Sequence, residues 1–376
     1  MHIGLDGYPL SEPRTGVGHY TLELSHALAL ANPVDQFELV SPAPFDPRVL
    51  DSYPIRNLTF VQAKSSSIRG HWWSVGLPLY AKRASWDLFH GTNFELPLWN
   101  RRKAVLTIHD LSALRYPELH RPRLARRARL RLPLAARLAA AIITPTEAVK
   151  QEVCAQFHFR SPNKVTAIHE APRSVFQPMQ HRESAEVRRR LGIEDEFLLF
   201  VGTLEPRKNL LTLLKAFVEI LRHTSLRPQL VVAGGEGWLM DETFSFIKES
   251  LLNEHLRLTG YLEDEDLRAL YSSCRAFIYP SLYEGFGLPP LEAMACGAPV
   301  VASRIPALQE TLDDAAILIE PLDVEGLAKA IVGLLQHDEH RREVSVAGLT
   351  RVERFSWTRT AQLTYEVYRR VLTGSR

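Results

Sequence analysis

The chain has 376 residues, of which 45% are hydrophobic and 23% are charged, and this composition excludes a disordered protein. Its length exceeds what a single hydrophobic core usually serves, so we expect two domains. The formal net charge of +2 excludes a protein that binds polyanions over its whole surface, although charge can still gather locally.

Strand-like runs alternate with helical runs along the chain, which predicts parallel sheets with helices on both faces. Six strands are predicted in the first half, with the sequences HIGLD, FELVSP, LTFVQA, DLFHG, AVLTIHD and AIITP. Six more are predicted in the second half, with the sequences FLLFVG, QLVVAGG, LRLTG, AFIYPS, PVVAS and AILIE. The fold class is therefore α/β, with two doubly wound, Rossmann-like domains.

The domain boundary is expected where the strand pattern stops. Residues 172–196 are polar, contain prolines and show no core-forming strand, so we place the interdomain linker there. The first domain is predicted to span residues 1–180 and the second residues 190–356. The final segment, residues 357–376, is predicted to form a helix with an apolar side made of Trp357, Leu363, Tyr365, Val367 and Tyr368.

The first loop at a strand end carries Gly16 and Gly18, just before a helix predicted to start at His19. Ligands of open parallel sheets bind beyond the carboxyl ends of the strands, and glycines let a backbone approach a ligand closely. A plain tight turn explains the same glycines equally well. The third glycine and the strand-end acid of a dinucleotide-binding fingerprint are missing, which argues against an oxidoreductase.

Two other strand ends in the first half carry polar and aromatic side chains. His90, Asn93 and Phe94 lie around the end of the fourth strand, and we interpret them as a wall that binds a saccharide, because sugars favour polar groups beside an aromatic face. The fifth strand ends in His109 and Asp110, and Asp110 is counted with the same wall. A single histidine at a strand end is more often structural than catalytic.

Residues 115–143 form a basic segment that contains one acid, Glu118, among leucines and alanines. A basic amphipathic helix of this kind lies on anionic membrane surfaces, where each cation contributes about 1 kcal/mol. A solvated helix face, or a site for an acidic acceptor, is the alternative. Nucleic acid is not an expected partner, because the interleaved aromatics of a stacking platform are missing. The arginines expected at the membrane are Arg123, Arg126, Arg127, Arg129 and Arg131.

In the second half, Arg207 and Lys208 lie in a loop that leads from a strand into a helix predicted to begin near Asn209. Cations are disfavoured at the positive end of a helix by about 0.3 to 1 kcal/mol, so their presence there indicates an anion. An arginine fork and a mobile lysine suit a leaving diphosphate. The alternative is a solvated basic loop.

The next loop of interest contains an acid-any-acid triplet, Asp264 to Asp266. Metal-dependent glycosyltransferases of another fold hold a divalent ion with such a triplet. Here the acids open a predicted helix, where acids are favoured by the helix dipole, so we prefer the structural interpretation and expect no metal.

The most informative segment is residues 281–303, in which Glu284 and Glu292 flank a glycine-proline turn. The turn is predicted to open a short helix whose unpaired N–H groups bind an anion. Because the two prolines lack an N–H, the donors that remain are those of Phe286, Gly287 and Leu288. Carboxylates repel a phosphate, so we interpret these acids as acceptors for neutral hydroxyls, Glu292 for a ribose and Glu284 for a sugar. The spacing alone fits equally well an alternative in which Glu292 is an acid favoured by the helix dipole and Glu284 a solvated loop acid.

The same segment resembles the signature of glycosyltransferase family 4, whose members are retaining enzymes of the GT-B fold. The pattern is a glutamate, seven further residues and a second glutamate, and Glu284 and Glu292 match it. The resemblance extends over both halves of the chain in the family's order. It implies two domains that face each other across a cleft, with the terminal helix crossing back to the first domain.

The resemblance also implies roles for individual residues. Lys208 aligns with the family's diphosphate lysine, whereas the arginine usual at the preceding strand end is Thr203 here, which leaves Arg207 as the candidate for the missing charge. His109 aligns with the active-site histidine beside the transferred sugar. Backbone groups around Tyr261 and Leu262 are implied at the nucleotide base, and the loop of Gly16 and Gly18 at the diphosphate or acceptor.

The sequence is thus expected to encode a retaining, metal-independent glycosyltransferase that needs no cofactor beyond its nucleotide-sugar donor. Residues 4–24 resemble bacterial polysaccharide mannosyltransferases, which implies GDP-mannose and a saccharide or lipid-linked acceptor. The alternatives are an epimerase or hydrolase that acts on a nucleotide sugar, and a non-catalytic sugar-nucleotide-binding protein.

The compartment is indicated by cysteine usage and hydropathy. Cys154, Cys274 and Cys296 lack metal-site spacing and are odd in number, which favours a reducing environment. The first residues lack the pattern of a signal peptide, and nowhere do 18 uncharged apolar residues follow one another. We therefore expect a cytoplasmic protein, peripheral on the inner face of the plasma membrane.

Overall fold

The computed structural model describes residues 1–11, 16–50, 55–63, 71–97, 103–159, 161–250, 252 and 254–374. It divides into two compact units. Unit 1 comprises Met1–Arg115, Pro122–Glu170 and Ser356–Arg376, and unit 2 comprises Tyr116–Arg121 and Ala171–Phe355. The chain passes from unit 1 to the long segment of unit 2 between Glu170 and Ala171. Residues 172–196, where the linker is expected, therefore lie inside unit 2.

Unit 1 is built on a seven-stranded, wholly parallel sheet in the order β3-β2-β1-β4-β5-β6-β7. The strands are β1 (His2–Asp6), β2 (Gln36–Ser41), β3 (Leu58–Gln62), β4 (Leu88–Gly91), β5 (Lys103–Thr107), β6 (Ala141–Thr144) and β7 (Val165–Ala167). The six predicted strands are confirmed. The seventh, β7, was not predicted, because three residues are too few to show an alternating pattern.

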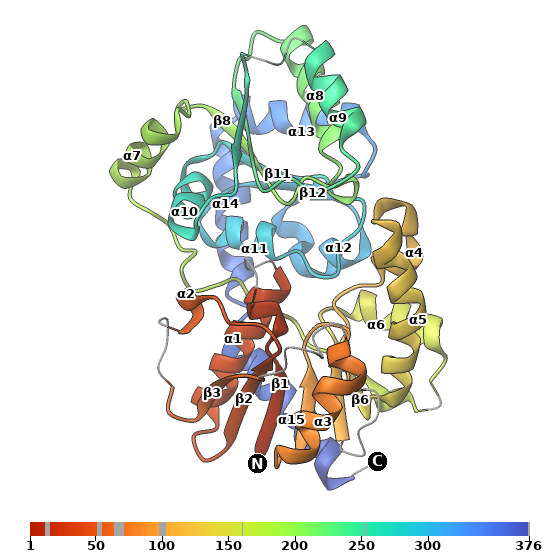
Figure 1. Cartoon of the computed structure of the whole chain (residues 1–376). Coiled ribbons are helices and arrows are strands. Elements are labelled where there is room, and N and C mark those ends of the chain that lie inside the picture. Colours follow the sequence, from red (N-terminus) through yellow and green to blue (C-terminus); the bar gives the residue numbers. More distant parts are fainter. Residues whose placement is uncertain are drawn as a thin grey trace. The chain divides into compact units, whose positions relative to one another are not determined.

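Helices and short helical turns complete unit 1 (Figure 1). They are η1 (Tyr8–Leu10), α1 (Gly16–Ala31), α2 (Pro47–Leu50), η3 (Trp72–Gly76), α3 (Leu77–Arg83), α4 (Ser112–Arg115), α5 (Pro122–Leu138), α6 (Glu147–Phe157), η5 (Pro162–Lys164) and α15 (Trp357–Thr373). The apolar core includes Trp72, Trp73 and Trp86.

Unit 2 has a six-stranded parallel sheet in the order β10-β9-β8-β11-β12-β13, and the strand order reverses between β8 and β11. The strands are β8 (Phe197–Val201), β9 (Gln229–Ala233), β10 (Leu256–Gly260), β11 (Ala276–Tyr279), β12 (Val300–Ser303) and β13 (Ile317–Ile319). All six are confirmed predictions. The reversal is the topological switch point at which doubly wound sheets bind ligands.

The helical elements of unit 2 lie on both sides of its sheet, with α8, α9 and α13 on one side and α10, α11 and α14 on the other (Figure 1). They are η4 (Pro117–Leu119), α7 (His181–Leu191), η6 (Pro206–Lys208), α8 (Leu210–His223), α9 (Asp241–Glu249), α10 (Asp264–Ser273), α11 (Leu288–Ala295), α12 (Pro306–Leu312), η7 (Asp313–Ala315), α13 (Val324–Gln336) and α14 (Asp338–Val352). Helix α7 occupies part of the expected linker and packs against α10.

The terminal helix α15 returns to unit 1, as expected, and packs along α1. Its Tyr368 hydroxyl lies 2.6 Å from Nδ1 of His90, and the Tyr365 hydroxyl donates to Asp35. Thr360 donates to the carbonyl of His169 at 2.7 Å. These polar contacts, together with the buried Trp357, fix the helix to the domain that begins the chain.

Within the part of the chain that the structure describes, no helix is both long enough and apolar enough to cross a membrane.

Candidate active site

The turn before α11 has the local structure that its sequence predicts. Gly287 has φ +95°, and a Cβ there would lie 2.5 Å from Cδ2 of Leu308, so glycine is required. The two prolines fall in the first turn, and Gly297, with φ +84°, follows the helix end. Phe286 and Leu288, the neighbours of Gly287, are buried.

Glu284 lies in a buried charge cluster with both of the predicted cations. Lys208 Nζ is 2.7 Å from Oε1 of Glu284, and an Arg207 guanidinium nitrogen is 3.0 Å from Oε2. Lys208 also donates to the Tyr279 hydroxyl at 2.7 Å. Burial alone raises the pKa of Glu284, but the charges of Lys208 and Arg207 outweigh it and bring the pKa to about 2. Glu284 is therefore ionised at any physiological pH.

The cluster is balanced in charge by a second carboxylate that the sequence reasoning missed. Glu205 is 4% exposed and accepts a 2.5 Å hydrogen bond from Arg207. Two cations thus face two carboxylates in this cluster. Arg207 and Lys208 are the cations predicted for a leaving diphosphate, and the structure adds the carboxylates that they face, which the sequence alone does not specify.

Glu292, the predicted ribose ligand, is likewise paired, and its partner was missed. Nε of Arg173 donates to Oε1 of Glu292 at 2.7 Å, and Nη1 of Arg173 donates to both carboxylate oxygens of Asp264, at 2.7 and 2.8 Å. Arg173 is 7% exposed and Glu292 is 4% exposed. The only sequence feature that indicates this partner is an arginine at the start of residues 172–196, the polar stretch predicted as the linker.

The acid triplet opens α10 as predicted, and its members form ion pairs. Asp264 pairs with Arg173, and Asp266 pairs with Arg190. Tyr261, in the loop before the helix, is 53% exposed, Leu262 is half-buried, and Thr203 is exposed at the end of β8. All three lie near the carboxyl ends of strands of the unit 2 sheet, the edge at which such sheets bind ligands.

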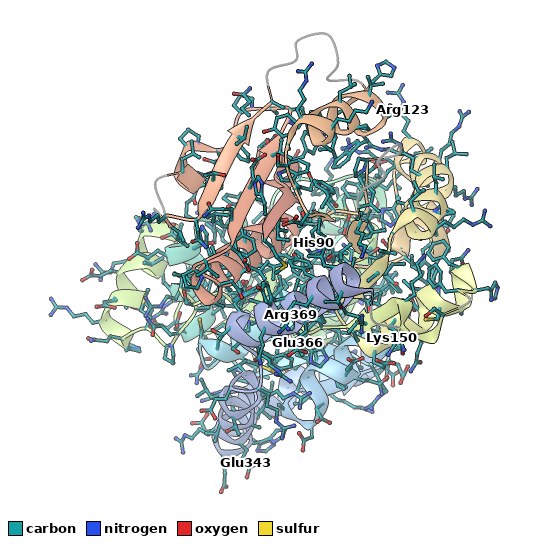
Figure 2. All side chains as sticks on the ribbon, turned by 90° about the horizontal axis from the view of Figure 1, so that it is seen from below. His90, Arg123, Lys150, Glu343, Glu366 and Arg369 are labelled. Carbon is teal, nitrogen blue, oxygen red and sulfur yellow. The ribbon has the colours of Figure 1, made fainter. Side chains whose placement is uncertain are left out.

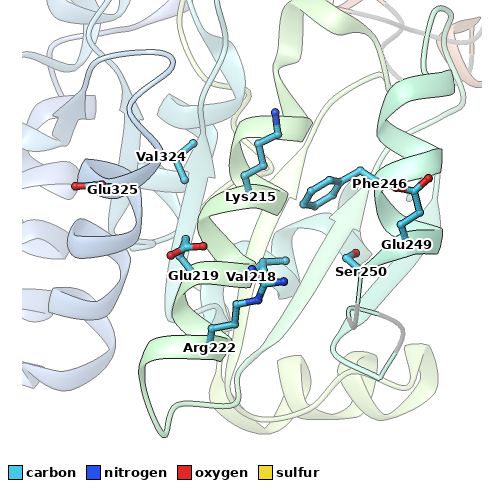
Figure 3. Close-up of a pocket in the computed structure, with 9 residues that line it drawn as sticks. All are labelled: Lys215, Val218, Glu219, Arg222, Phe246, Glu249, Ser250, Val324 and Glu325. Carbon is cyan, nitrogen blue, oxygen red and sulfur yellow. The ribbon is translucent and has the colours of Figure 1, made fainter.

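A separate cavity of about 660 Å³ in unit 2 is lined by side chains of α8, α9 and the start of α13 (Figure 3). Among them are Lys215 and Arg222 from α8 and Phe246 from α9. None of the described residues that line it belongs to the predicted site.

In unit 1, His109 lies in a polar environment that favours its protonated form. Its Nδ1 is 3.1 Å from Oε1 of Glu170, and its Nε2 is 2.8 Å from the carbonyl oxygen of Thr92. Burial lowers the pKa of His109, but the hydrogen bond and the charge of Glu170 outweigh burial and raise it. Both ring nitrogens face acceptors, so the imidazolium can donate from both, beside the rings of Tyr20 and Phe94.

The prediction that His90 lines an acceptor site is wrong. His90 is fully buried on β4, with its ring nitrogens held by the hydroxyls of Tyr368 and Thr107, and burial lowers its pKa to about 3. Figure 2 shows it inside unit 1, whereas Arg123 lies at the periphery. All four residues of β4 are buried, as in parallel strands covered on both faces, so His90 binds α15 rather than a ligand.

The other predicted acceptor residues occupy the loops after β4 and β5. Asn93 and Phe94 are half-buried, and Phe94 has φ 58°. Asp110 accepts hydrogen bonds from the backbone N–H and the hydroxyl of Ser112, at 2.8 and 2.7 Å, and so initiates α4. Asp110 therefore has a structural function that the sequence reasoning did not assign.

The loop of Gly16 and Gly18 is shorter than expected, because both glycines lie in the first turn of α1 instead of preceding it. A Cβ at Gly16 would meet no atom of the described residues within 4 Å, while Gly18 is buried. The part of this predicted loop at residues 12–15 lies outside the described residues.

The basic segment forms helix α5, with one face buried through Ala125, Leu132, Ala135 and Ala136. Arg127 and Arg131 are not freely solvated, because both pair with Glu95, at 2.7 and 2.9 Å. The outer side carries exposed leucines and exposed arginines together. The leucines are Leu124, Leu130, Leu134 and Leu138, and the arginines are Arg123, Arg126, Arg127, Arg129 and Arg137.

Comparisons with known proteins identify the family. Residues 14–171 match the family Glycosyltransferase Family 4, and residues 183–350 match Glycosyl transferases group 1. The chain is 32% identical over 382 residues to O-antigen chain mannosyltransferase B of Escherichia coli, covering 96% of this chain and 97% of that protein. The chain belongs to glycosyltransferase family 4.

Solved structures support the same fold for this family 4 glycosyltransferase. Sucrose-phosphate synthase from Thermosynechococcus elongatus matches with a TM-score of 0.79 and 23% identity over 100% of both chains. HepE from Anabaena, in complex with UDP and glucose, matches with a TM-score of 0.73 and 20% identity over 98% of both chains. At these identities the likeness shows the fold alone, which is GT-B.

The donor-side candidates of this glycosyltransferase converge within unit 2. The loops after β8 and β11 adjoin because these strands are neighbours, and they bring Lys208 to Glu284. Arg173 and Asp264 extend this group of charged residues to Glu292 on α11. The candidates of unit 1, led by His109, form their own group around the ends of β4 and β5.

Proposed function

We propose that this enzyme is a retaining mannosyltransferase that transfers mannose from GDP-mannose to a saccharide or lipid-linked acceptor in cell-surface polysaccharide synthesis. The observation that carries the reaction class is the buried cluster of Lys208, Arg207 and Glu284 at the switch point of the unit 2 sheet. The mannosyl donor rests on the likeness to the O-antigen mannosyltransferase described above.

The charge cluster suits a diphosphate leaving group. When a donor binds, its phosphates compete with Glu205 and Glu284 for Arg207 and Lys208, and the cations then stabilise the charge that develops as the glycosidic bond breaks. Glu284, released from the cations, is left to accept hydrogen bonds from the sugar hydroxyls. Two cations and the N–H groups around Gly287 supply this stabilisation from the protein itself, so the proposal includes no metal.

The remaining roles follow the family resemblance. Glu292 holds the ribose, backbone groups around Tyr261 and Leu262 contact the base, and His109 contributes a cation beside the transferred sugar. Attack from the front face retains the anomeric configuration, and the acceptor proton passes to the leaving phosphate.

The test of this proposal is release of GDP from GDP-mannose by the purified enzyme, with and without mannose-terminated acceptors. A mannosyltransferase releases GDP in proportion to acceptor and forms a longer saccharide in which the new linkage has the donor's α configuration. Release without any acceptor would indicate the hydrolase, isomerised sugar the epimerase, and binding without turnover a non-catalytic protein. Parallel reactions with UDP, ADP and TDP sugars decide the donor.

We further propose that the enzyme acts in the cytoplasm and docks reversibly on the inner face of an anionic membrane through the outer side of α5. Exposed leucines there share the surface with arginines, which is the pattern of an interfacial helix. Leu130, for example, is 69% exposed. Pairing of Arg127 and Arg131 with Glu95 leaves Arg123, Arg126 and Arg129 as the stronger contributors.

Replacing Leu130, Leu134 and Leu138 together by glutamine is expected to weaken cosedimentation with phosphatidylglycerol vesicles by about tenfold or more, because each leucine buries apolar surface worth about 1 kcal/mol. The matched control replaces three exposed leucines elsewhere, Leu30, Leu239 and Leu322, and should leave binding unchanged. Equal binding to neutral phosphatidylcholine vesicles, or no effect of the first substitutions, would contradict the docking surface.

A further inference from the structure

Arg173 lies where it can control the carboxylate that the proposed function assigns to the ribose. Arg173 lies near the start of the long segment of unit 2, Ala171–Phe355. Its guanidinium connects this segment to the start of α10 through Asp264 and to α11 through Glu292. Its carbon Cζ lies 4.6 Å from the centre of the Phe176 ring, and this ring forms a T-shaped pair with the ring of Tyr271. The arginine is thus held on its flat face as well as through its nitrogens.

We propose that Arg173 is a positioning residue for nucleotide binding, which keeps Glu292 ionised and oriented toward the ribose hydroxyls. The inference rests on the proposed function, because it presupposes that Glu292 binds the ribose. A carboxylate can accept about four hydrogen bonds, so the pair with Arg173 leaves capacity for a ribose hydroxyl. A neutral Glu292 would lose the strong, charge-assisted form of that hydrogen bond.

The electrostatic surroundings of Glu292 explain why such a partner is needed. Burial raises the pKa of Glu292, Arg173 lowers it by its charge and hydrogen bond, and Asp264 raises it, with the net pKa above the ordinary value. Arg173 is thus the cation that opposes both burial and the neighbouring acid. Without it, Glu292 would be protonated at a higher pH.

The other titratable groups that face Glu292 do not change charge near neutral pH. They are Tyr271 on α10 and Cys296 after α11, and burial raises the pKa of Tyr271 well above its ordinary range and that of Cys296 to about 12. Elements α12, α14, β11 and β12 also pack against α11, and among the described residues none of them supplies a group that shifts the pKa of Glu292. The pH response should therefore depend on Arg173 and Asp264.

Two substitutions are expected to move the pH response in opposite directions. Arg173→Gln removes the cation, so Glu292 should lose its charge at a higher pH and nucleotide affinity should fall near pH 6 while recovering near pH 9. Asp264→Asn removes the competing acid, so affinity should persist to a lower pH than in the wild type. Arg173→Lys retains a positive charge and should restore part of the loss near pH 6. A merely structural effect of these substitutions would not produce opposite shifts.

The experiment measures, by calorimetry, the affinity for GDP and for 2′,3′-dideoxy-GDP, which lacks the ribose hydroxyls, with UDP and its dideoxy analogue in parallel. The wild type should prefer the ribonucleotide by about tenfold or more, the value of a hydrogen bond to a charged group. Near pH 6, Arg173→Gln should lose most of this preference and Glu292→Gln should lose it at every pH. Arg188→Gln is the control, because Arg188 is also buried in unit 2 and paired with an acid, Asp195, outside the proposed site.

The outcomes separate the two proposals. If Glu292→Gln abolishes the preference but Arg173→Gln keeps it near pH 6, or loses it equally at all pH values, the role of Arg173 is wrong. If Glu292→Gln keeps the preference, or the wild type binds neither nucleotide, the proposed function of the site is wrong instead. If Arg173→Gln does not fold, the Asp264→Asn profile decides, and an unshifted profile there rejects the inference.

Discussion

Replacing Lys208 by alanine is expected to lower acceptor-dependent release of the nucleoside diphosphate by at least about 100-fold, the loss typical when one preorganised electrostatic group is removed from a transition state. Lys208 is 9% exposed, and its ammonium group lies between Glu284 and Tyr279. In this dry environment a positive charge is worth far more to a departing diphosphate than it would be in water. The measurement is the steady-state rate at saturating donor and acceptor.

The control for this substitution is Lys215→Ala, which removes an exposed lysine of α8 that lines the separate cavity of unit 2 (Figure 3). It should leave the rate unchanged. Thermal unfolding of Lys208→Ala should still be cooperative, because Arg207 continues to neutralise Glu284. A folded Lys208→Ala enzyme with the wild-type rate would reject the assignment of the diphosphate site.

The convergence of the donor loops could be predicted from the sequence, whereas their internal pairing could not. Strands that follow the doubly wound order place the loops after β8 and β11 side by side, and these loops carry Lys208 and Glu284, the residues predicted to bind the diphosphate and the sugar of the donor. The sequence does not show whether Arg207 and Lys208 are paired with carboxylates of the protein itself. Glu205 settles that point here, since it supplies the second negative charge.

The wrong prediction for His90 and the failure to predict a role for Arg173 have a related cause. His90 was interpreted from its position near a strand end, but the strand is buried on both faces and the partner of the histidine, Tyr368, comes from the opposite end of the sequence. A contact over 278 residues has no local signal. Arg173 was missed for the same reason, because its partners Asp264 and Glu292 lie 91 and 119 residues further along the chain.

Gly234 and Gly235 follow β9 as adjacent glycines, and the sequence does not show that they differ. In the structure they differ in backbone conformation and in the space around them. Gly234 has φ +146°, and a Cβ there would lie 1.9 Å from the carbonyl oxygen of Gly202 at the end of β8. Its N–H donates to the carbonyl of Gly260 at the end of β10. Three strand ends of the unit 2 sheet therefore meet at this residue. Gly235 has no positive φ in this range, and a Cβ there would meet nothing within 4 Å in the part of the chain that the structure describes.

Gly234→Ala is therefore expected to destabilise unit 2 by about 4 kcal/mol or more, because a φ that disfavours side chains costs about 1 to 3 kcal/mol and the clash is with backbone that cannot move aside. Gly235→Ala should change the free energy of unfolding by less than about 0.5 kcal/mol. Urea unfolding of both variants, followed by tryptophan fluorescence, measures the difference. The loop that carries Lys208 begins just after Gly202, so at a temperature where Gly234→Ala stays folded, its nucleotide affinity should fall as well. Equal losses of stability in the two variants would show that the close approach of β8 and β9 is not what requires glycine here.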